Sequence, residues 1–464
     1  MPSIRAIRGR SAAASLRPGK ESRMRDTNPG AYRAIWRWHF YAGLMVAPFV
    51  LLLSLTGALY LFDREIEGVV YADRMHVPAV RAPLPLLDQQ AAVLRAYPGA
   101  TVKRIVLPER QTDAGQWLVA RDGVDTLVFV DPGSGRVTGD IDPEWRLMAV
   151  VRRIHGTLLA GQVGSYIVEL MACWTLIMLG TGLILWWPRH WRLRGVFVPR
   201  LAARGRRFWR DLHAIPAMVN ALLVMGLILT GLPWSAFWGV QFARIGTVSP
   251  LTEPSPNFRD PPEHAEHKLT TADGVPWTIA NSPAPHGGHG HGHGRATLAD
   301  VERALSDYKV APGARIFLPQ PGGSLITISL TPDQAERQRT LYLDAADGSV
   351  IDDIGWADYS PLAKAVEWGT MAHMGRQFGL ANQLLALAVA LTLAASVVTG
   401  VYMWWCRRPK GQLAAPGGVQ DRLPRPVKLM IATIAALFPL VGASLVLAVT
   451  VEGILGAARR LRGA

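Results

Sequence analysis

Four histidines recur at matched positions in the two halves of this 464-residue chain, and they are the residues best suited to carry chemistry. His39 and His213 lie 174 residues apart, and each is followed at the same distance by a Thr-Gly pair. His155 and His373 lie 218 residues apart, and each precedes a Thr-Gly pair and then a Trp-Trp pair. Spacing that repeats without a gap indicates an internal duplication.

The chemistry open to these histidines depends on their place beside long apolar stretches. Histidine near a hydrocarbon core is costly and usually faces a bundle interior or a cofactor. His39 and His213 would lie at one membrane face, and His155 and His373 at the other, so each pair could give two axial nitrogens to one haem iron. The alternative is four interfacial side chains that reach water, which a duplication would copy equally well. Since the sequence holds no Cys-x-x-Cys-His, any haem would be b-type.

The apolar stretches follow from composition. Hydrophobic residues make up 50% of the chain and charged residues only 18%, below the roughly 25% of a soluble domain. Each stretch is near or above the roughly 20 residues that a membrane-spanning helix needs. The five stretches are 40–62, 170–188, 212–243, 380–406 and 429–451. This pattern excludes a disordered chain, a soluble enzyme and a disulfide scaffold, and it places both cysteines, Cys173 and Cys406, inside spans.

The formal net charge of +14 reflects membrane topology, not nucleic-acid binding. Arginine and lysine cluster before the first span, between the second and third, and between the fourth and fifth. The positive-inside rule therefore places the N-terminus in the cytoplasm and residues 63–155 and 244–375 outside. Three arginines after the fifth span, Arg459, Arg460 and Arg462, oppose this orientation for that helix. The first span is too long for a signal peptide and is expected to be retained.

The outside segments repeat as well. Each predicts a helix, two strands and an Asp-to-Gly hairpin: 87–96, 102–107, 117–121 and 128–137, then 298–306, 314–318, 325–330 and 341–350. The fold class is thus an α-helical polytopic membrane protein with a duplicated four-helix core, one extra span and two small α+β modules. The expected order is basic N-terminus 1–35, span 36–62, module 63–155, span 156–188, basic loop 189–211, span 212–243, module 244–375, span 376–406, loop 407–428 and span 429–451.

Two further features have chemical potential. The second outer segment contains a glycine-rich run with four histidines, His286, His289, His291 and His293, and two more upstream, His264 and His267. Such a tract is typical of a flexible accessory site for a divalent metal. Glu169 lies within or just above the second span, where its counterpart in the repeat is Leu387. An intramembrane carboxylate fits a proton relay, a group beside a haem propionate, or a side chain that reaches the interface.

These residues together resemble the PepSY-associated transmembrane family, inner-membrane proteins linked to iron uptake that include ferrisiderophore reductases. The resemblance covers residues of about 33 to 408. It rests on Trp38-His39 with Gly43 and Thr56-Gly57, on His155-Gly156 with Thr181-Gly182 and Trp186-Trp187-Pro188-Arg189, and on hairpins near 131–135 and 344–348. The sequence departs from the family pattern at Met403-Trp404-Trp405-Cys406-Arg407, which lacks the proline, and in the histidine-rich insert.

The resemblance implies a function. Members hold b-type haems through span histidines and move electrons from the cytoplasmic side to a periplasmic ferric chelate. For this chain it implies two haems, on His39 with His213 and on His155 with His373, in the bacterial inner membrane. The electron donor would be a quinol or a flavoprotein, and the acceptor a ferric siderophore or another Fe(III) chelate that releases Fe(II). No catalytic residue is expected beyond the haem ligands.

Two other classes of function stay open. In the first, a non-redox metal handler, residues 286–293 buffer or pass a metal and the spans only anchor them, so His155 and His373 would be dispensable. In the second, a PepSY-type regulator of a periplasmic protease, neither set of histidines is needed. Absorbance in the Soret region separates the reductase from both.

Overall fold

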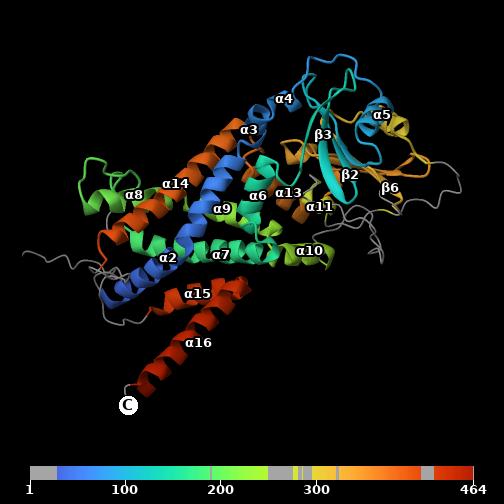
Figure 1. Cartoon of the computed structure of the whole chain (residues 1–464). Coiled ribbons are helices and arrows are strands. Elements are labelled where there is room, and N and C mark those ends of the chain that lie inside the picture. Colours follow the sequence, from blue (N-terminus) through green and yellow to red (C-terminus); the bar gives the residue numbers. More distant parts are fainter. Residues whose placement is uncertain are drawn as a thin grey trace, which may run out of the picture.

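A computed structural model describes residues 29–188, 191–248, 275–280, 285, 295–319, 323–408 and 423–462. Long helices form one part of the molecule, and a β-sheet flanked by short helices forms the other (Figure 1). We call the end of the helices nearest the sheet the sheet side, and the opposite end the far side. The histidine-rich residues His264, His267, His286, His289, His291 and His293 lie outside the described residues.

Three of the described helices are long and apolar enough to cross a membrane. They are α2 (Pro29–Tyr60), α7 (Gly161–Trp186) and α14 (Leu380–Trp405). A fourth candidate is broken, because α8 (Arg206–Val219) meets α9 (Ala221–Gly231) and η1 (Leu232–Trp234) at a bend of 55°. Asn220, with φ −92° and ψ 0°, separates α8 from α9 at this bend. The chain is therefore a multi-pass membrane protein.

Two short helices precede α7 and α14, and each ends at or near a histidine. Helix α6 (Leu147–Thr157) is separated from α7 by a turn in which Leu158 and Leu159 adopt positive φ. Helix α13 (Pro361–His373) is separated from α14 by a turn that contains two glycines with positive φ, Gly375 and Gly379. His155 and His373 therefore lie on separate short helices that can be aimed independently of the spans.

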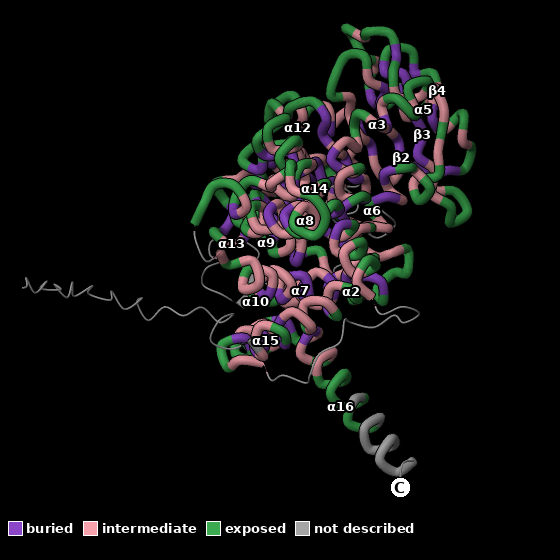
Figure 2. The backbone as a smooth tube through the Cα atoms, turned by 90° about the vertical axis from the view of Figure 1, so that its left-hand side faces the viewer, coloured by how far each residue is buried: buried purple, intermediate pink, exposed green. Residues whose placement is uncertain are grey.

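The fifth apolar stretch is not one helix. Helix α15 (Arg425–Leu437) and helix α16 (Pro439–Arg462) are separated by Phe438. A residue before proline is disfavoured in the α region, and Phe438 has φ −120° and ψ 88°. Helix α15 packs on α7, and the Trp174 indole donates to the Ser444 hydroxyl of α16 at 3.0 Å. Beyond that contact α16 extends away from the rest of the molecule (Figure 2).

The described strands form one antiparallel sheet of eight strands in the order β4-β3-β2-β1-β5-β6-β7-β8. The first module contributes β1 (Thr101–Val106), β2 (Gly115–Arg121), β3 (Val124–Val130) and β4 (Val137–Ile141). The second contributes β5 (Arg315–Phe317), β6 (Leu325–Leu330), β7 (Arg339–Asp344) and β8 (Val350–Gly355). The four predicted strands correspond to β1, β2, β5 and β6, whereas the predicted hairpins at 128–137 and 341–350 cover only part of the strands that they join.

Each module closes with the hairpin that its Asp-to-Gly segment predicts. The N–H of Gly135 donates to the Asp131 carbonyl at 2.8 Å, and the N–H of Gly348 donates to the Asp344 carbonyl at 2.9 Å. Both glycines have positive φ, +72° and +76°, a conformation in which a side chain would be strained. The duplication therefore extends to the geometry of the turns.

The two modules are joined edge to edge, which the sequence did not predict. Strands β1 and β5 pair antiparallel, with Ile105 opposite Ile316. Both isoleucines enter the core beneath α5 (Leu86–Ala96) and α12 (Leu298–Asp307), the helix of each module. An unpaired edge strand is a site of aggregation, so pairing β1 with β5 protects one edge of each module.

The remaining described helices are short connections around the sheet and the spans. They are α3 (Asp63–Val70), α4 (Ala72–Met75), α10 (Trp238–Val248), α11 (Trp277–Ala280), η4 (Ala335–Arg337) and η5 (Trp356–Asp358). Among the spans, α2 packs against both α7 and α14, and α14 also packs against α8. Helix α2 therefore contacts elements of both halves.

Candidate haem-ligand histidines

The structure brings the four repeat histidines together as two pairs. The rings of His39 and His213 have centroids 6.5 Å apart with an interplanar angle of 84°. The rings of His155 and His373 also have centroids 6.5 Å apart, with an angle of 78°. His155 contacts Thr56, which lies 17 residues after His39 on α2, so the pairs are separated by about 25 Å along that helix. One pair lies on the far side and the other on the sheet side.

Three of the four rings are held by a Thr-Gly pair of another helix. Nδ1 of His39 lies 2.9 Å from the Thr181 hydroxyl, and a methyl group added to Gly182 would lie 3.3 Å from the ring. Glycine at this position leaves room for the imidazole, which a methyl group would push aside by a few tenths of an ångström.

The sheet-side histidines repeat this arrangement. His155 lies 3.0 Å from the Thr56 hydroxyl, and His373 lies 3.1 Å from the Thr230 hydroxyl. A methyl group on the following glycine, Gly57 or Gly231, would lie 3.2 or 3.3 Å from the ring. We call each of these contacts a Thr-Gly clasp, defined by the threonine hydroxyl at Nδ1 and the glycine beneath the ring.

The fourth histidine, His213, is held by a variant of the clasp in which a backbone carbonyl replaces the threonine hydroxyl. A methyl group on Gly400 would lie 3.1 Å from the His213 ring, as the repeat predicts. However, Nδ1 of His213 donates to the backbone carbonyl of Ser396 at 2.7 Å, in place of a hydroxyl from Thr399. The Thr399 hydroxyl donates to the Ala395 carbonyl one turn earlier.

The hydrogen bonds determine which ring nitrogen carries the proton. Each clasp threonine donates its only hydroxyl hydrogen to the carbonyl four residues earlier, at 2.8 Å for Thr56, Thr181 and Thr230. The hydroxyl oxygen can then only accept from Nδ1–H, and the Ser396 carbonyl has no hydrogen to donate. All four histidines are therefore placed as the tautomer whose Nε2 carries the lone pair, which is the form that binds a metal.

The clasps join elements within one half, whereas the histidine pairs join the two halves. His39 is held by α7 and His155 by α2, all from the first half. His213 is held by α14 and His373 by α9, all from the second. Since each pair takes one histidine from each half, a ligand between the rings would bridge the duplicated halves. The sequence showed the Thr-Gly pairs as part of the repeat but did not reveal that they hold the histidine rings. Each Thr-Gly pair has the same repeat offset as a histidine, and that coincidence was the signal that could have revealed it.

Buried carboxylates support the helices that carry the sheet-side histidines. Glu67 on α3 accepts from the backbone N–H of Met148 at the start of α6 and pairs with Arg146 at 2.6 Å. Glu367 on α13 accepts from the N–H of Thr278 at 2.8 Å and from the Gln338 amide at 3.2 Å. Burial raises the pKa of Glu367, although these donors oppose the shift. Both carboxylates therefore act on the position of a helix that carries one of the paired histidines.

We expect Glu67→Gln to destabilise the protein by about 3 kcal/mol, because it leaves the half-buried Arg146 guanidinium without its charged partner. The matched control is Glu144→Gln. Glu144 is 70% exposed and pairs with Arg153, which lies on α6. An exposed pair contributes roughly 0 to 1 kcal/mol, so that change should be nearly silent. Thermal unfolding of the detergent-purified variants measures both, and equal shifts would contradict this assignment.

Glu169 has a structural partner. Its side chain is 2% exposed, and Oε2 accepts from the N–H of Phe237 at 2.8 Å, just before α10. A carboxylate at a helix N-terminus satisfies a backbone donor and interacts favourably with the helix dipole. The carboxylate is therefore buried and engaged with the backbone at the start of α10.

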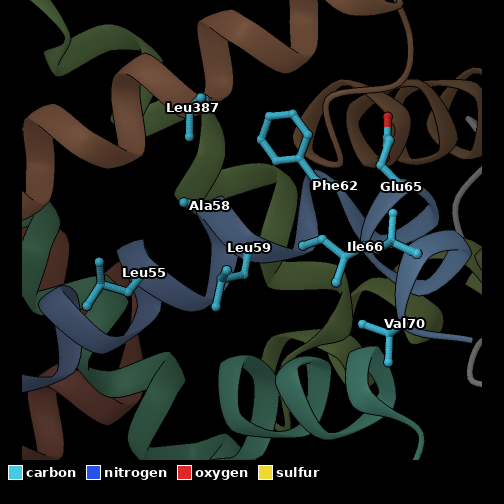
Figure 3. A pocket seen from close by; sticks show the side chains of 9 residues that line it. Leu55, Ala58, Leu59, Phe62, Glu65, Ile66, Val70 and Leu387 are labelled. Atoms are coloured by element: carbon cyan, nitrogen blue, oxygen red, sulfur yellow. The ribbon is translucent and has the colours of Figure 1, made fainter.

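The repeat counterpart of Glu169, Leu387, lines an apolar groove between α2, α3 and α14 (Figure 3). The other lining residues are Leu55, Ala58, Leu59, Phe62, Glu65, Ile66, Val69 and Val70. Leu55, Ala58 and Leu59 share one face of α2, and Gly57 lies on the opposite face. The groove is therefore separate from the histidine pairs, and its apolar lining suits contact with lipid.

Each histidine pair stands alone as a set of metal ligands. Within the ranges that the structure describes, no group of three or more His, Cys, Asp or Glu side chains is placed to hold a metal ion. Both cysteines are free thiols, with Cys173 buried and Cys406 exposed. The two imidazoles of each pair are the candidate site.

Comparison with known proteins identifies the family. A search of curated proteins finds no match to this chain. A family model described as the PepSY-associated TM region matches residues 36–407, which include both histidine pairs, the clasps and the whole sheet. The resemblance that the sequence motifs indicated is thereby confirmed, and the chain belongs to the PepSY-associated TM family.

Proposed function

We propose that the protein is a haem-containing reductase of the bacterial inner membrane. It would hold one b-type haem between His39 and His213 and a second between His155 and His373, and it would pass electrons to a ferric siderophore or another Fe(III) chelate. In this proposal α2, α7, α8 with α9, and α14 form a four-helix core. The basic segments orient the far side and the N-terminus to the cytoplasm, and the sheet to the periplasm.

The observation that carries the proposal is the spacing of the two pairs. Two metal–nitrogen bonds of about 2 Å each, plus two imidazole radii, add up to roughly 6 to 6.5 Å. Both ring-centroid distances are 6.5 Å. Because Nδ1 of every ring is occupied by an acceptor, Nε2 is the nitrogen left for a metal.

The number of ligands also favours haem. A protein site for zinc or copper uses three or four side chains, whereas a haem iron already has four in-plane nitrogens and needs two axial ligands. Each site here offers two histidines. Both ends of the bundle offer the same two-histidine site, although the Ser396 carbonyl replaces a threonine hydroxyl in the contact that holds His213.

When bound, such a haem exchanges one electron at a time between its Fe(III) and Fe(II) states. The residues of the chain hold the ligand rings, exclude water with apolar helices, and set the two sites about 25 Å apart along α2. The two sites therefore lie toward opposite faces of a hydrocarbon core of roughly 30 Å, so that electrons would cross it from one haem to the other. A quinol or a flavoprotein would supply electrons at the cytoplasmic face. Reduction of the chelate releases Fe(II) because hard anionic oxygens prefer Fe(III), so no nucleophile is required.

The decisive experiment is an absorption spectrum of the detergent-purified full chain, as isolated and after dithionite. The proposal predicts a b-type spectrum and a pyridine haemochrome value near two haems per chain. Addition of a ferric chelate to the reduced protein should reoxidise it. A colourless protein from haem-replete cells would overturn the proposal and favour metal handling by residues 286–293.

The clasp threonines give a second prediction. Thr56→Val and Thr230→Val keep the side-chain shape but remove the acceptor for Nδ1–H of His155 and His373. Loss of such a partner typically weakens metal binding by about 10- to 100-fold, so we expect lower occupancy of the sheet-side haem. Haem titration of apoprotein measures the effect.

Thr175→Val is the matched control for the clasp variants. This buried threonine lies on α7 and donates to the Met171 carbonyl, as the clasp threonines donate to theirs. It does not hold a histidine. If the control weakened haem binding as much as Thr56→Val, the clasp would have no specific role.

A further inference from the structure

The last two helices, α15 and α16, fold back on each other at Phe438. In one continuous helix, residues seven positions apart are separated by about 10 Å along the axis. Here a Cβ atom added to Gly442 of α16 would lie only 2.9 Å from the backbone oxygen of Ala435 on α15. Figure 1 shows the two helices as arms that leave one apex toward the side where α2 begins. We call residues 425–462 the helical hairpin.

The first arm of the helical hairpin runs from the far side toward the sheet side. Helix α7, on which it packs, begins on the sheet side and ends on the far side. Met430 lies beside Gly180, because a Cβ atom added to that glycine would be 2.7 Å from the methionine sulfur. Eight residues later the Phe438 ring lies 6.0 Å from the ring of Trp238, at the start of α10, where Glu169 of α7 is bound. The apex is therefore nearer the sheet side than Met430 is.

The second arm returns toward the far side. The Trp174 indole of α7 donates to the Ser444 hydroxyl at 3.0 Å. Trp174 lies between Glu169 and Gly180 on α7, so within six residues of the apex the chain has already moved back along that span. Helix α16 continues without a break to Arg462. Its end therefore lies on the same side as the start of α15.

The apex is built to lie at hydrocarbon depth. Non-helical backbone is tolerated there only where it is buried in protein and its polar groups are satisfied. Phe438 is 8% exposed, and its N–H donates to the Ile434 carbonyl at 2.8 Å. Its own carbonyl accepts from the N–H groups of Val441 and Gly442 at 2.9 and 3.2 Å. Pro439 has no N–H to satisfy, so these groups of the turn need no water.

The arms are too short to cross the membrane and too apolar to lie in water. The uncharged parts of the two arms, 429–437 and 439–451, are about 14 and 20 Å long, against a hydrocarbon core of roughly 30 Å. Val446, Leu447 and Val449 of α16 are 65 to 68% exposed. Large exposed apolar surface of this kind marks contact with a membrane or a partner, and α16 here extends from a membrane-spanning helix.

We propose that the helical hairpin is re-entrant: it enters the lipid from the far side and returns to it, and α16 contacts acyl chains without crossing the membrane. The sequence predicted a fifth span over 429–451, which left Arg459, Arg460 and Arg462 on the outside. A re-entrant hairpin places these positions on the same side as the other basic segments, as the positive-inside rule requires. The inference goes beyond the proposed function and needs no haem.

The test is thiol accessibility in the full-length chain, with Cys173→Ala and Cys406→Ala as the background. Ala464→Cys reports the C-terminus. Ala202→Cys, in the exposed turn before α8, is the far-side reference, and Glu144→Cys, 70% exposed before α6, is the sheet-side reference. A maleimide that does not cross membranes is added to spheroplasts and to inverted membrane vesicles. We expect Ala464→Cys to match Ala202→Cys, with labelling in inverted vesicles and loss of labelling in spheroplasts.

Leu447→Cys reports whether α16 lies in lipid. This variant should stay unlabelled in both preparations and react only after denaturation, because the bilayer excludes the reagent. Labelling of Leu447→Cys in inverted vesicles would overturn the proposal, since α16 would then lie in water. Labelling of Ala464→Cys in spheroplasts, together with Glu144→Cys, would overturn it as well, since α16 would then cross the membrane.

The same assay separates the hairpin from the orientation used in the proposed function. If Ala202→Cys and Ala464→Cys were both labelled only in spheroplasts, the hairpin would be supported and the orientation of the whole chain would be reversed. A wild-type chain without a b-type spectrum would overturn the proposed function and leave these labelling results unchanged.

Discussion

Replacement of His155 or His373 by alanine should reduce haem from two per chain to one. Each residue would supply one of only two protein ligands at the sheet side, and its loss leaves the opposite imidazole as a single weak attachment. The far-side pair, about 25 Å away along α2, has its own clasps and should keep its haem. A pyridine haemochrome assay and the reduced-minus-oxidised spectrum of each variant measure this change. The corresponding His39→Ala variant should lose the other haem and leave a distinguishable remaining spectrum.

His76→Ala is the control for these variants. His76 follows α4, and its Nε2 lies 3.2 Å from the carbonyl of Gly68, so it belongs to neither histidine pair. It should retain two haems per chain. Equal haem content in His155→Ala and the wild type would exclude the bis-histidine assignment at the sheet side.

Gly231→Val should displace the sheet-side haem without changing any ligand. A Cβ atom at Gly231 would already lie 3.3 Å from Cε1 of His373, and the branched side chain of valine adds two methyl groups at that contact. The ring has to move, which breaks its 3.1 Å contact with Thr230 and misaligns Nε2. We expect haem content near one per chain, with the far-side spectrum preserved. The readout is again the haemochrome assay, combined with thermal unfolding to confirm that the variant is folded.

Gly226→Val tests whether any valine in this helix has the same effect. Gly226 lies on α9 with Gly231, and a Cβ atom there meets nothing within 4 Å. Valine also has a better helix propensity than glycine. The control should keep both haems, and a similar loss in the two variants would show that the effect comes from the helix and not from the clasp.

Local patterns in the sequence determined the elements of this protein. Long uncharged runs predicted α2, α7 and α14, because a helix in lipid must be apolar along its whole length. Short alternating runs predicted the strands, and Asp131 to Gly135 and Asp344 to Gly348 predicted the hairpins, because glycine accepts the positive φ that these turns need. The matched offsets predicted that His39 belongs with His213 and His155 with His373. These signals reside in neighbouring residues or in the duplication itself.

Contacts between distant residues were decided only by the tertiary structure. The apolar stretch near 429–451 reads as one span, yet the structure breaks it at Phe438, where the following proline disfavours the helix. Glu169 reads as an intramembrane carboxylate, yet it caps the start of α10. A continuous apolar run is compatible with one helix or with two, and a carboxylate in a span is compatible with several partners, so the sequence pattern alone did not decide either case.

The clasps and the β1–β5 pairing share a physical origin. Thr56 lies 99 residues from His155, and Ile105 and Ile316, which pair across β1 and β5, are more than two hundred residues apart. Hydropathy and spacing report which face of an element is apolar, and they do not report which face of another element lies against it. That choice is made when the two halves pack together, because only then do the glycines admit the imidazoles and the edge strands find each other. The histidines were therefore predictable as a repeated set, whereas their orientation and their neighbours depended on the packing of the whole chain.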